Sequence, residues 1–165
     1  MSLRLLTAGE SHCPSLTAIL DGLPAGLPLT PAVFETDLAR RQQGYGAGPR
    51  MKLEHDQVQI LGGVMGGVTT GAPLALLIEN KEHDRWRGRP VEPMTSPRPG
   101  HADLTGAVKF GYRDLRQALE RASARETAAR VAAGAACRSL LAQWDIQVGG
   151  YVCAIGDVEA DMSAI

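Results

Sequence analysis

Residues 120–131 read Glu-Arg-Ala-Ser-Ala-Arg-Glu-Thr-Ala-Ala-Arg-Val, and this stretch decides how the second half of the chain folds. Ser123 and Glu126 have the S-x-x-E spacing of a capping box, in which the serine hydroxyl accepts from the N–H of Glu126 and the glutamate reaches back to the serine N–H. The sequence therefore predicts a helix that begins after the capping box and ends near Trp144. One face of this helix is a stripe of small residues that lets a neighbouring element pack closely, made of Val131, Ala132, Ala135 and Ser139.

Two segments flank this helix. Residues 103–121 predict one or two helices, which Gly106 and Gly111 weaken because glycine costs helix stability. Residues 146–155 are apolar and predict a strand that two glycines interrupt.

The first half of the chain predicts mainly strands. Thr30 followed by Pro31 is typical of an N-cap and a first helical position, and this helix should end near Gln43. Residues 80–99 are charged and proline-rich, so we expect a mobile loop there. Four apolar runs bounded by turn residues predict strands at residues 3–7, 16–20, 58–64 and 73–78.

Composition excludes several classes of protein. The chain has 165 residues, a length that suits one domain, and 44% of them are hydrophobic, which excludes gross disorder. The formal net charge of −1 argues against a dedicated nucleic-acid binder. No apolar run approaches the roughly 20 residues that a membrane span needs. The beginning of the chain lacks a signal-peptide pattern and the three cysteines are widely spaced, so a cytoplasmic protein is expected.

A basic, glycine-rich segment is a candidate anion site. From Arg40 to Lys52 the chain has four positive charges and no negative one, and Gly44 to Arg50 is a glycine-rich loop. Backbone N–H groups and arginines together suit a phosphate or a carboxylate. An ordinary surface turn after a basic helix end explains the same pattern. The loop is neither a Walker loop nor a dinucleotide-binding fingerprint.

Other candidate functional residues lie in predicted turns and at a helix start. His12 and His101 could act as acid or base because the unperturbed imidazole pKa is about 6.5. Alternatively, His12 could be an ordinary surface histidine of a loop, and His101 could simply be part of a helix entry. Ser123 and Arg125 suit an anion, or serve only as a cap and an ion-pair partner. Cys13 adjoins His12 but should point to the opposite face, so we interpret it as a packing residue. The four histidines lack metal-binding spacing, and no metal is expected.

Taken together, these stretches resemble the chorismate synthase family. The resemblance rests on four collinear signatures: Gly9-Glu10-Ser11-His12; Arg41-Gln42 with Gly44-Tyr45-Gly46 and Arg50-Met51; Gly63-Val64 with Gly67 and Thr69-Thr70-Gly71-Ala72-Pro73; and Arg98-Pro99-Gly100-His101-Ala102-Asp103-Leu104 followed by residues 120–131.

The resemblance implies a fold and an activity. The fold would be α+β, a β-α-β sandwich with helices packed between antiparallel sheets, assembled as a homotetramer. The activity would be that of a lyase of the shikimate pathway, which converts 5-enolpyruvylshikimate 3-phosphate to chorismate by anti-1,4 elimination of phosphate for aromatic amino-acid biosynthesis. The cofactor would be reduced FMN, which NADPH reduces in some members. Because family members are about twice as long, residues 1–165 would be a single, incomplete domain, the N-terminal half of the fold.

The resemblance also assigns roles to residues. His12 resembles the acid that protonates the departing phosphate, and His101 resembles the histidine beside the reduced flavin. The segment Ala122, Ser123 and Ala124 matches the one that contacts FMN, and Arg41 also matches a position associated with NADP. The substrate-anion clamps would be Arg41, Arg50, Arg98 and Arg125.

The sequence departs from the family pattern at two positions. Cys13 stands where the family usually has glycine, which could crowd the loop that holds His12. Ala47 stands where the family usually has arginine, which removes one charged contact. These departures and the short length leave a second hypothesis open. The chain could be a truncated, non-catalytic homologue that binds the anionic substrate or a full-length partner subunit.

Overall fold

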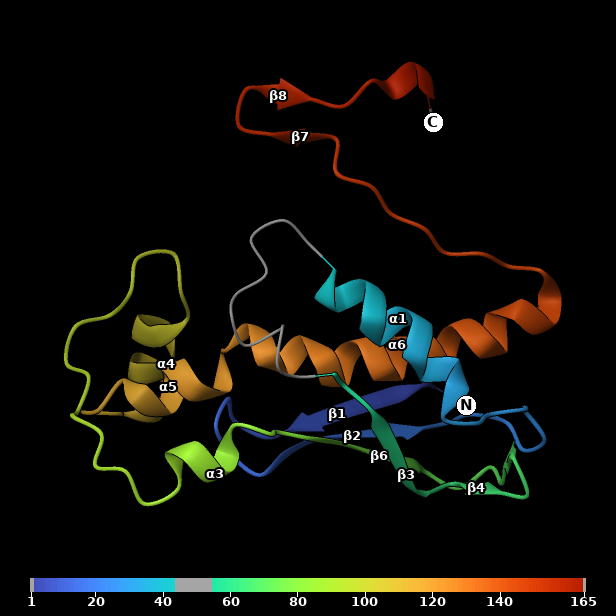
Figure 1. Ribbon diagram of the computed structural model, residues 1–165, viewed down its shortest axis with the longest axis horizontal. Helices are drawn as coiled ribbons and strands as arrows, with labels where there is room; N and C mark the ends of the chain where they lie inside the picture. The colour runs from blue at the N-terminus through green and yellow to red at the C-terminus, as the bar shows by residue number, and fades with distance from the viewer. Residues whose placement is uncertain (1, 44–54, 165) are drawn as a thin grey trace.

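A four-stranded antiparallel sheet lies on one side of the molecule, and two long helices cover one of its faces (Figure 1). The computed structural model describes residues 2–43 and 55–164. The strand order is β1-β2-β6-β3, and each strand lies within two residues of a predicted one. The strands are β1 (Arg4–Ala8), β2 (Ser15–Asp21), β6 (Leu74–Glu79) and β3 (Val58–Gly62).

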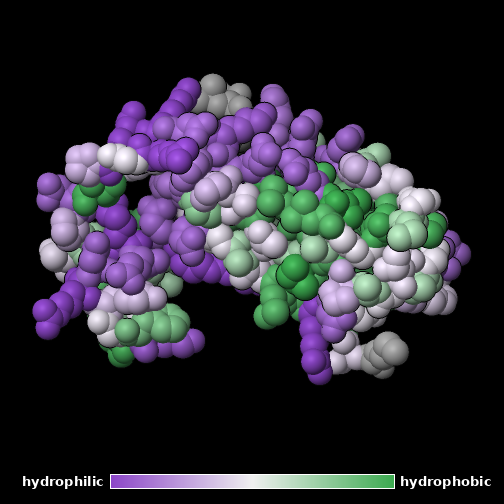
Figure 2. Space-filling view, turned by 90° about the horizontal axis from the view of Figure 1, so that it is seen from below, coloured by the Kyte–Doolittle hydropathy of each residue, from purple (hydrophilic) through white to green (hydrophobic). Residues whose placement is uncertain are grey.

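The register of the sheet separates its two faces. Leu20 of β2 pairs with Leu5 of β1 and with Leu74 of β6, and this row of side chains faces the helices. Leu6 pairs with Ile19, so these two side chains lie on the opposite face. Figure 2 views the molecule from the sheet side and shows apolar residues gathered there. Leu6 is 71% exposed, so the open face of the sheet carries apolar surface.

The helices α1 (Ala32–Gln42) and α6 (Thr127–Leu141) pack against each other, and α6 packs on β2 and β6. Phe34 and Leu38 anchor α1 and are 0% and 1% exposed. Burying each such side chain contributes about 1.5–3 kcal/mol. The predicted small-residue stripe is confirmed at its centre, since α6 buries six alanines against the core, namely Ala128, Ala129, Ala132, Ala133, Ala135 and Ala136. The helix continues into the 3-10 turn η2 (Ala142–Trp144), which is where the sequence predicts the end.

Shorter elements complete the described chain. The predicted helical segment 103–121 forms two helices, α4 (Asp103–Phe110) and α5 (Arg116–Arg121), with Gly111 in a left-handed conformation (φ 71°) at the end of α4. Residues 80–99 include the short helix α3 (His83–Trp86), and the mobility of this segment stays a prediction. The others are β4 (Val64–Met65), β5 (Val68–Thr69), β7 (Ala154–Ile155), β8 (Val158–Glu159), η1 (Ala124–Glu126) and η3 (Met162–Ala164).

The strand predicted at 146–155 is wrong over most of its length. Only Ala154–Ile155 is a strand, paired with β8 in a hairpin that lies away from the rest of the fold (Figure 1). A strand needs a neighbour to accept and donate its backbone hydrogen bonds. Within the described ranges, residues 147–152 have no strand beside them, and their apolar side chains are exposed.

Both predicted helix caps differ from the structure. Thr30 does not cap α1 with its side chain, because the helix begins at Ala32 and the Thr30 carbonyl instead accepts the Val33 N–H at 3.0 Å. The Ser123 hydroxyl accepts from the Arg125 N–H at 3.2 Å, not from Glu126. A 3-10 turn intervenes, and the Glu126 carboxylate instead accepts from Thr7 at 2.6 Å and from Arg130, one helical turn later, at 2.8 Å. One tertiary and one local contact therefore replace the reciprocal capping bond.

No helix in residues 2–43 or 55–164 is both long and apolar enough to cross a membrane.

Candidate functional site

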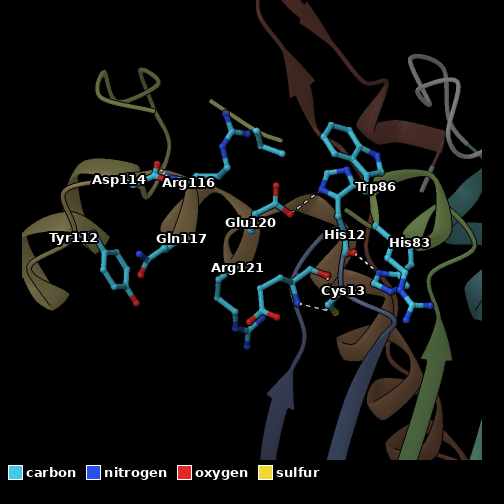
Figure 3. A pocket seen from close by; sticks show the side chains of 13 residues that line it. His12, Cys13, His83, Trp86, Tyr112, Asp114, Arg116, Gln117, Glu120 and Arg121 are labelled. Carbon is cyan, nitrogen blue, oxygen red and sulfur yellow. Dashed lines mark hydrogen bonds and ion pairs between the residues drawn. The ribbon is translucent and has the colours of Figure 1, made fainter. Parts of the chain in front are cut away.

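A cavity of about 640 Å³ lies where the β1–β2 loop meets α3 and α5 (Figure 3). Its lining combines imidazole, carboxylate, guanidinium and aromatic groups. The residues that matter for its chemistry are His12, Trp86, Arg87, Arg116, Glu120 and Arg121. This mixture suits an anionic ligand that also carries a flat or apolar part.

His12 lies in this cavity and is held from two sides. Its Nδ1 lies 2.7 Å from Glu120 Oε2, and its ring lies 4.2 Å from the Trp86 ring, centroid to centroid, at a tilt of 42°. The imidazole side chain keeps 24% of its surface exposed, so a ligand can reach it. Figure 3 shows Glu120 approaching from α5 and Trp86 from α3. A histidine that is oriented in this way can transfer a proton.

The backbone of the His12 loop is fixed by hydrogen bonds from three directions. The Ser11 N–H donates to the Glu120 carbonyl at 3.0 Å. The Asn80 amide donates to the Cys13 carbonyl at 2.7 Å, and His83 Nδ1 donates to the His12 carbonyl at 2.8 Å. The loop is therefore pre-organised before any ligand arrives.

The Cys13 side chain lies inside this turn and contacts its backbone. Its thiol donates to the Ser15 carbonyl at 2.8 Å, and its sulfur accepts the Glu10 N–H at 3.1 Å. The sulfur is thus closely surrounded by the backbone of the turn, and the effect of a cysteine in place of glycine on the His12 loop stays a prediction.

Two of the predicted substrate-binding arginines meet at a buried carboxylate. Arg125 Nη1 and Arg41 Nη2 bind the two different oxygens of Asp56, the latter at 2.9 Å. Arg125 also donates from Nε to Asn80 Oδ1 at 2.7 Å and from Nη2 to the Glu79 carbonyl at 2.9 Å. The side chains of Arg125 and Asp56 are 4% and 1% exposed, so this ion cluster lies inside the fold and connects α1 and the 3-10 turn η1 to the sheet.

Arg98 forms the second predicted arginine site. Its Nε and Nη2 donate to the two oxygens of Asp103 at 2.8 and 2.9 Å, and its backbone N–H donates to the same carboxylate at 2.9 Å. The hydrogen bonds from the Arg98 guanidinium lower the pKa of Asp103 to about 2, although burial raises it. The pKa of Arg98 is raised, chiefly by its hydrogen bond to Asp103, and the Glu120 charge adds to this effect.

Asp103 should make the stability of the fold depend on pH. Its folded-state pKa of about 2 lies below the unfolded value, so its contribution is complete above about pH 4 and is lost as the pH falls towards 2. We expect Asp103→Asn to lower the free energy of unfolding at neutral pH by about 2 kcal/mol and to flatten its decline in acid. Urea denaturation at a series of pH values measures this. Asp84→Asn, at an exposed position, is the control, and an identical acid decline in both variants would contradict the assignment.

The remaining predicted site residues lie at the surface or outside the described residues. His101 is exposed at the start of α4, next to Asp103, whose pKa its charge also lowers. Ala122 and Ala124 are exposed, and the half-buried Ser123 donates its hydroxyl to the Ser11 hydroxyl at 3.1 Å. This contact brings the predicted FMN segment beside the His12 loop. Arg50 and the departure at Ala47 lie outside the described residues.

Four residues at the site are absent from the predictions made from the sequence. Glu120 orients His12, Trp86 covers its ring, Asp56 joins two arginines, and Asn80 connects Arg125 to the loop. Glu120 begins the segment 120–131 that carries the predicted capping box, yet its neighbours in sequence give no sign that its partner is His12. Asp56 follows the basic segment 40–52 closely in the sequence, and this proximity to the arginines is a signal that could have indicated it. Within the described parts of the chain, no group of three or more potential ligands is arranged to hold a metal ion.

Comparisons with known proteins agree with the resemblance seen in the sequence. The family model described as chorismate synthase matches residues 3–165. A chorismate synthase of Trichlorobacter lovleyi is 52% identical over 171 residues, covering 98% of this chain and 44% of that protein. One of Aquifex aeolicus is 53% identical over 168 residues, covering 96% of this chain and 42% of that protein. The chain thus spans less than half the length of these relatives.

The fold is also found in a solved structure. A crystal structure of chorismate synthase superposes with a TM-score of 0.77 at 45% sequence identity, over 97% of this chain and 40% of that one. The α+β fold class predicted from the sequence, with helices packed on antiparallel sheet, is therefore confirmed.

Proposed function

The chain belongs to the chorismate synthase family, and we propose that it supplies the His12 part of a lyase site. In the proposed reaction, 5-enolpyruvylshikimate 3-phosphate loses phosphate and one ring proton by anti-1,4 elimination and becomes chorismate. The observation that carries this proposal is the pairing of His12 with Glu120 in a cavity that arginines also line. A phosphate with two carboxylates is a substrate that needs several cations around a proton donor.

His12 would act as the acid. In the imidazolium form, Nδ1 donates to Glu120 and Nε2 donates to the oxygen that departs with the phosphate. As the carbon–oxygen bond breaks, the Nε2 proton moves to that oxygen and the electron pair of the N–H bond stays on the ring. A neutral imidazole remains, with its hydrogen on Nδ1. General acid catalysis of this kind contributes about 10²–10⁴ in rate.

The arginines would bind the anionic groups of the substrate. Arg98 keeps 35% of its side chain exposed while it binds Asp103, so its open side remains available to an oxyanion. Arg41 and Arg125 would add positive charge from the Asp56 cluster, and Arg50 would act from the basic loop. The same Arg41 would contact NADP where NADPH serves as the flavin reductant.

The residues present fit reduced FMN, which would lend an electron transiently when bound. Ala122 and Ala124 are exposed, and the Ser123 hydroxyl between them contacts Ser11 of the His12 loop. His101 is exposed and lies between Arg98 and Asp103 in the sequence. It would hold a proton beside the flavin. Trp86 and Tyr112 line opposite ends of the cavity (Figure 3), and each offers aromatic surface to a flat ring system.

The assembly would be a homotetramer in the cytoplasm. The open face of the sheet supports self-association, because an apolar sheet face of this kind is usually covered. Leu6 on this face and Leu61, at the register shift within β3, are 71% and 58% exposed.

An anaerobic titration of the chain with reduced FMN, with and without 5-enolpyruvylshikimate 3-phosphate, tests the proposal. We expect saturable binding that the substrate strengthens, followed by release of phosphate. Absence of binding by a folded sample would overturn the proposal. Binding without phosphate release would favour the second hypothesis, a non-catalytic homologue that binds substrate or a full-length partner, to which the missing arginine at Ala47 points.

A further inference from the structure

Glu120 holds the His12 loop with two different groups. Its backbone carbonyl accepts the Ser11 N–H at 3.0 Å, and its carboxylate oxygen lies 2.7 Å from His12 Nδ1. The first bond fixes where the loop sits on α5, and the second fixes how the ring is turned. A residue that makes both contacts controls position and orientation together.

The Glu120 carboxylate determines which atom carries the hydrogen in its contact with His12 Nδ1. An ionised carboxylate has no hydrogen to donate, so a hydrogen bond between the two groups requires the hydrogen on His12 Nδ1. A neutral imidazole has only one N–H, so Nε2 is then left without hydrogen. The Trp86 ring, at 4.2 Å, packs against the imidazole and opposes its rotation away from Glu120.

We propose that Glu120 is the positioning residue of His12, and that it selects the imidazole tautomer with hydrogen on Nδ1. Its catalytic meaning rests on the proposed function. After the imidazolium has given its Nε2 proton to the departing phosphate oxygen, the neutral product is the tautomer that Glu120 stabilises. The carboxylate therefore stabilises the neutral Nδ1–H imidazole that forms during the reaction. Carboxylates that accept from the second ring nitrogen of a metal-binding or catalytic histidine fix its tautomer in the same way.

Other charged groups around Glu120 leave this assignment unchanged. The guanidinium of Arg98 acts on Glu120 through its charge, and Arg121 and Arg116 line the same cavity. All three are guanidinium groups, which have no acceptor atoms, so none of them competes with Glu120 for the hydrogen on His12 Nδ1. Glu10 also lines the cavity and supplies a second carboxylate for comparison.

The test is the tautomer of His12, read from long-range ¹H–¹⁵N correlations of the histidine-labelled chain at alkaline pH. We expect the wild-type imidazole to carry its hydrogen on Nδ1. We expect Glu120→Gln to lose this preference, because the amide can donate to Nδ1 as well as accept from it. The control Glu10→Gln removes an equal charge from the same cavity and should keep the wild-type tautomer.

The outcomes are decisive without any turnover. A wild-type His12 with its hydrogen on Nε2 overturns the proposal even if the Glu120→Gln variant fails to fold. A folded Glu120→Gln variant with the wild-type tautomer also overturns it. Failure of the proposed reaction would show instead as absent FMN binding or absent phosphate release, so the two failures are distinguishable.

Discussion

Replacing Asp56 with alanine should lower the free energy of unfolding by about 3–5 kcal/mol, because it leaves buried charges without their partner. The carboxylate is shared by Arg125 and Arg41, whose side chains are only 4% and 11% exposed. Because both guanidinium groups are largely buried, water cannot readily replace the lost carboxylate. Urea denaturation followed by circular dichroism measures the loss, and the proposed anion site should weaken with it.

Asp37 provides the matched control for this prediction. It also binds two arginines, Arg40 and Arg138, but their side chains are 73% and 48% exposed. Water can replace a lost carboxylate at such positions, so Asp37→Ala should cost about 1 kcal/mol or less. Equal losses in the two variants would show that burial of the arginines is not what makes Asp56 important.

Local sequence patterns predict best the elements whose backbone hydrogen bonds are made within the same segment, which are the helices. The small-residue stripe of α6 specifies a helix whatever its partner, and the structure buries it against β2 and β6. The strand predicted at 146–155 is different, because a strand exists only through hydrogen bonds to a neighbour. Apolar residues alone do not supply that neighbour, and residues 147–152 lie without one in the described chain.

The candidate site divides in the same way between local and distant information. His12 is recognisable from its turn and its motif, and the structure places it in a cavity. Its partner Glu120 lies 108 residues further along the chain, and no pattern in either segment connects them. The same is true of Asp56 and Arg125, which are 69 residues apart. The charges in the sequence indicate an anion site, and only the fold decides which arginines already have a carboxylate.

The second large effect is expected at Gly9, where β1 leads into the His12 loop. Its φ of +112° is unfavourable for any residue with a Cβ, and a Cβ there would lie 2.6 Å from the Ser15 carbonyl oxygen and 3.0 Å from the Leu16 Cα. These neighbours are backbone atoms of β2 and cannot rotate away. We therefore expect Gly9→Ala to lower the free energy of unfolding by roughly 2–5 kcal/mol, as the sum of backbone strain and overpacking. Thermal and urea denaturation measure this loss.

Gly26→Ala separates the two causes. Gly26 also has a positive φ, of +85°, but no heavy atom lies within 4 Å of the position that its Cβ would take. The left-handed conformation alone costs about 1–2 kcal/mol, so the additional loss at Gly9 reports the clash with β2. Since Gly9 lies three residues before His12, relief of that clash should also move the loop. The His12 resonances should therefore shift in Gly9→Ala and stay unchanged in Gly26→Ala, and equal stability losses with unshifted resonances would refute the proposed close approach.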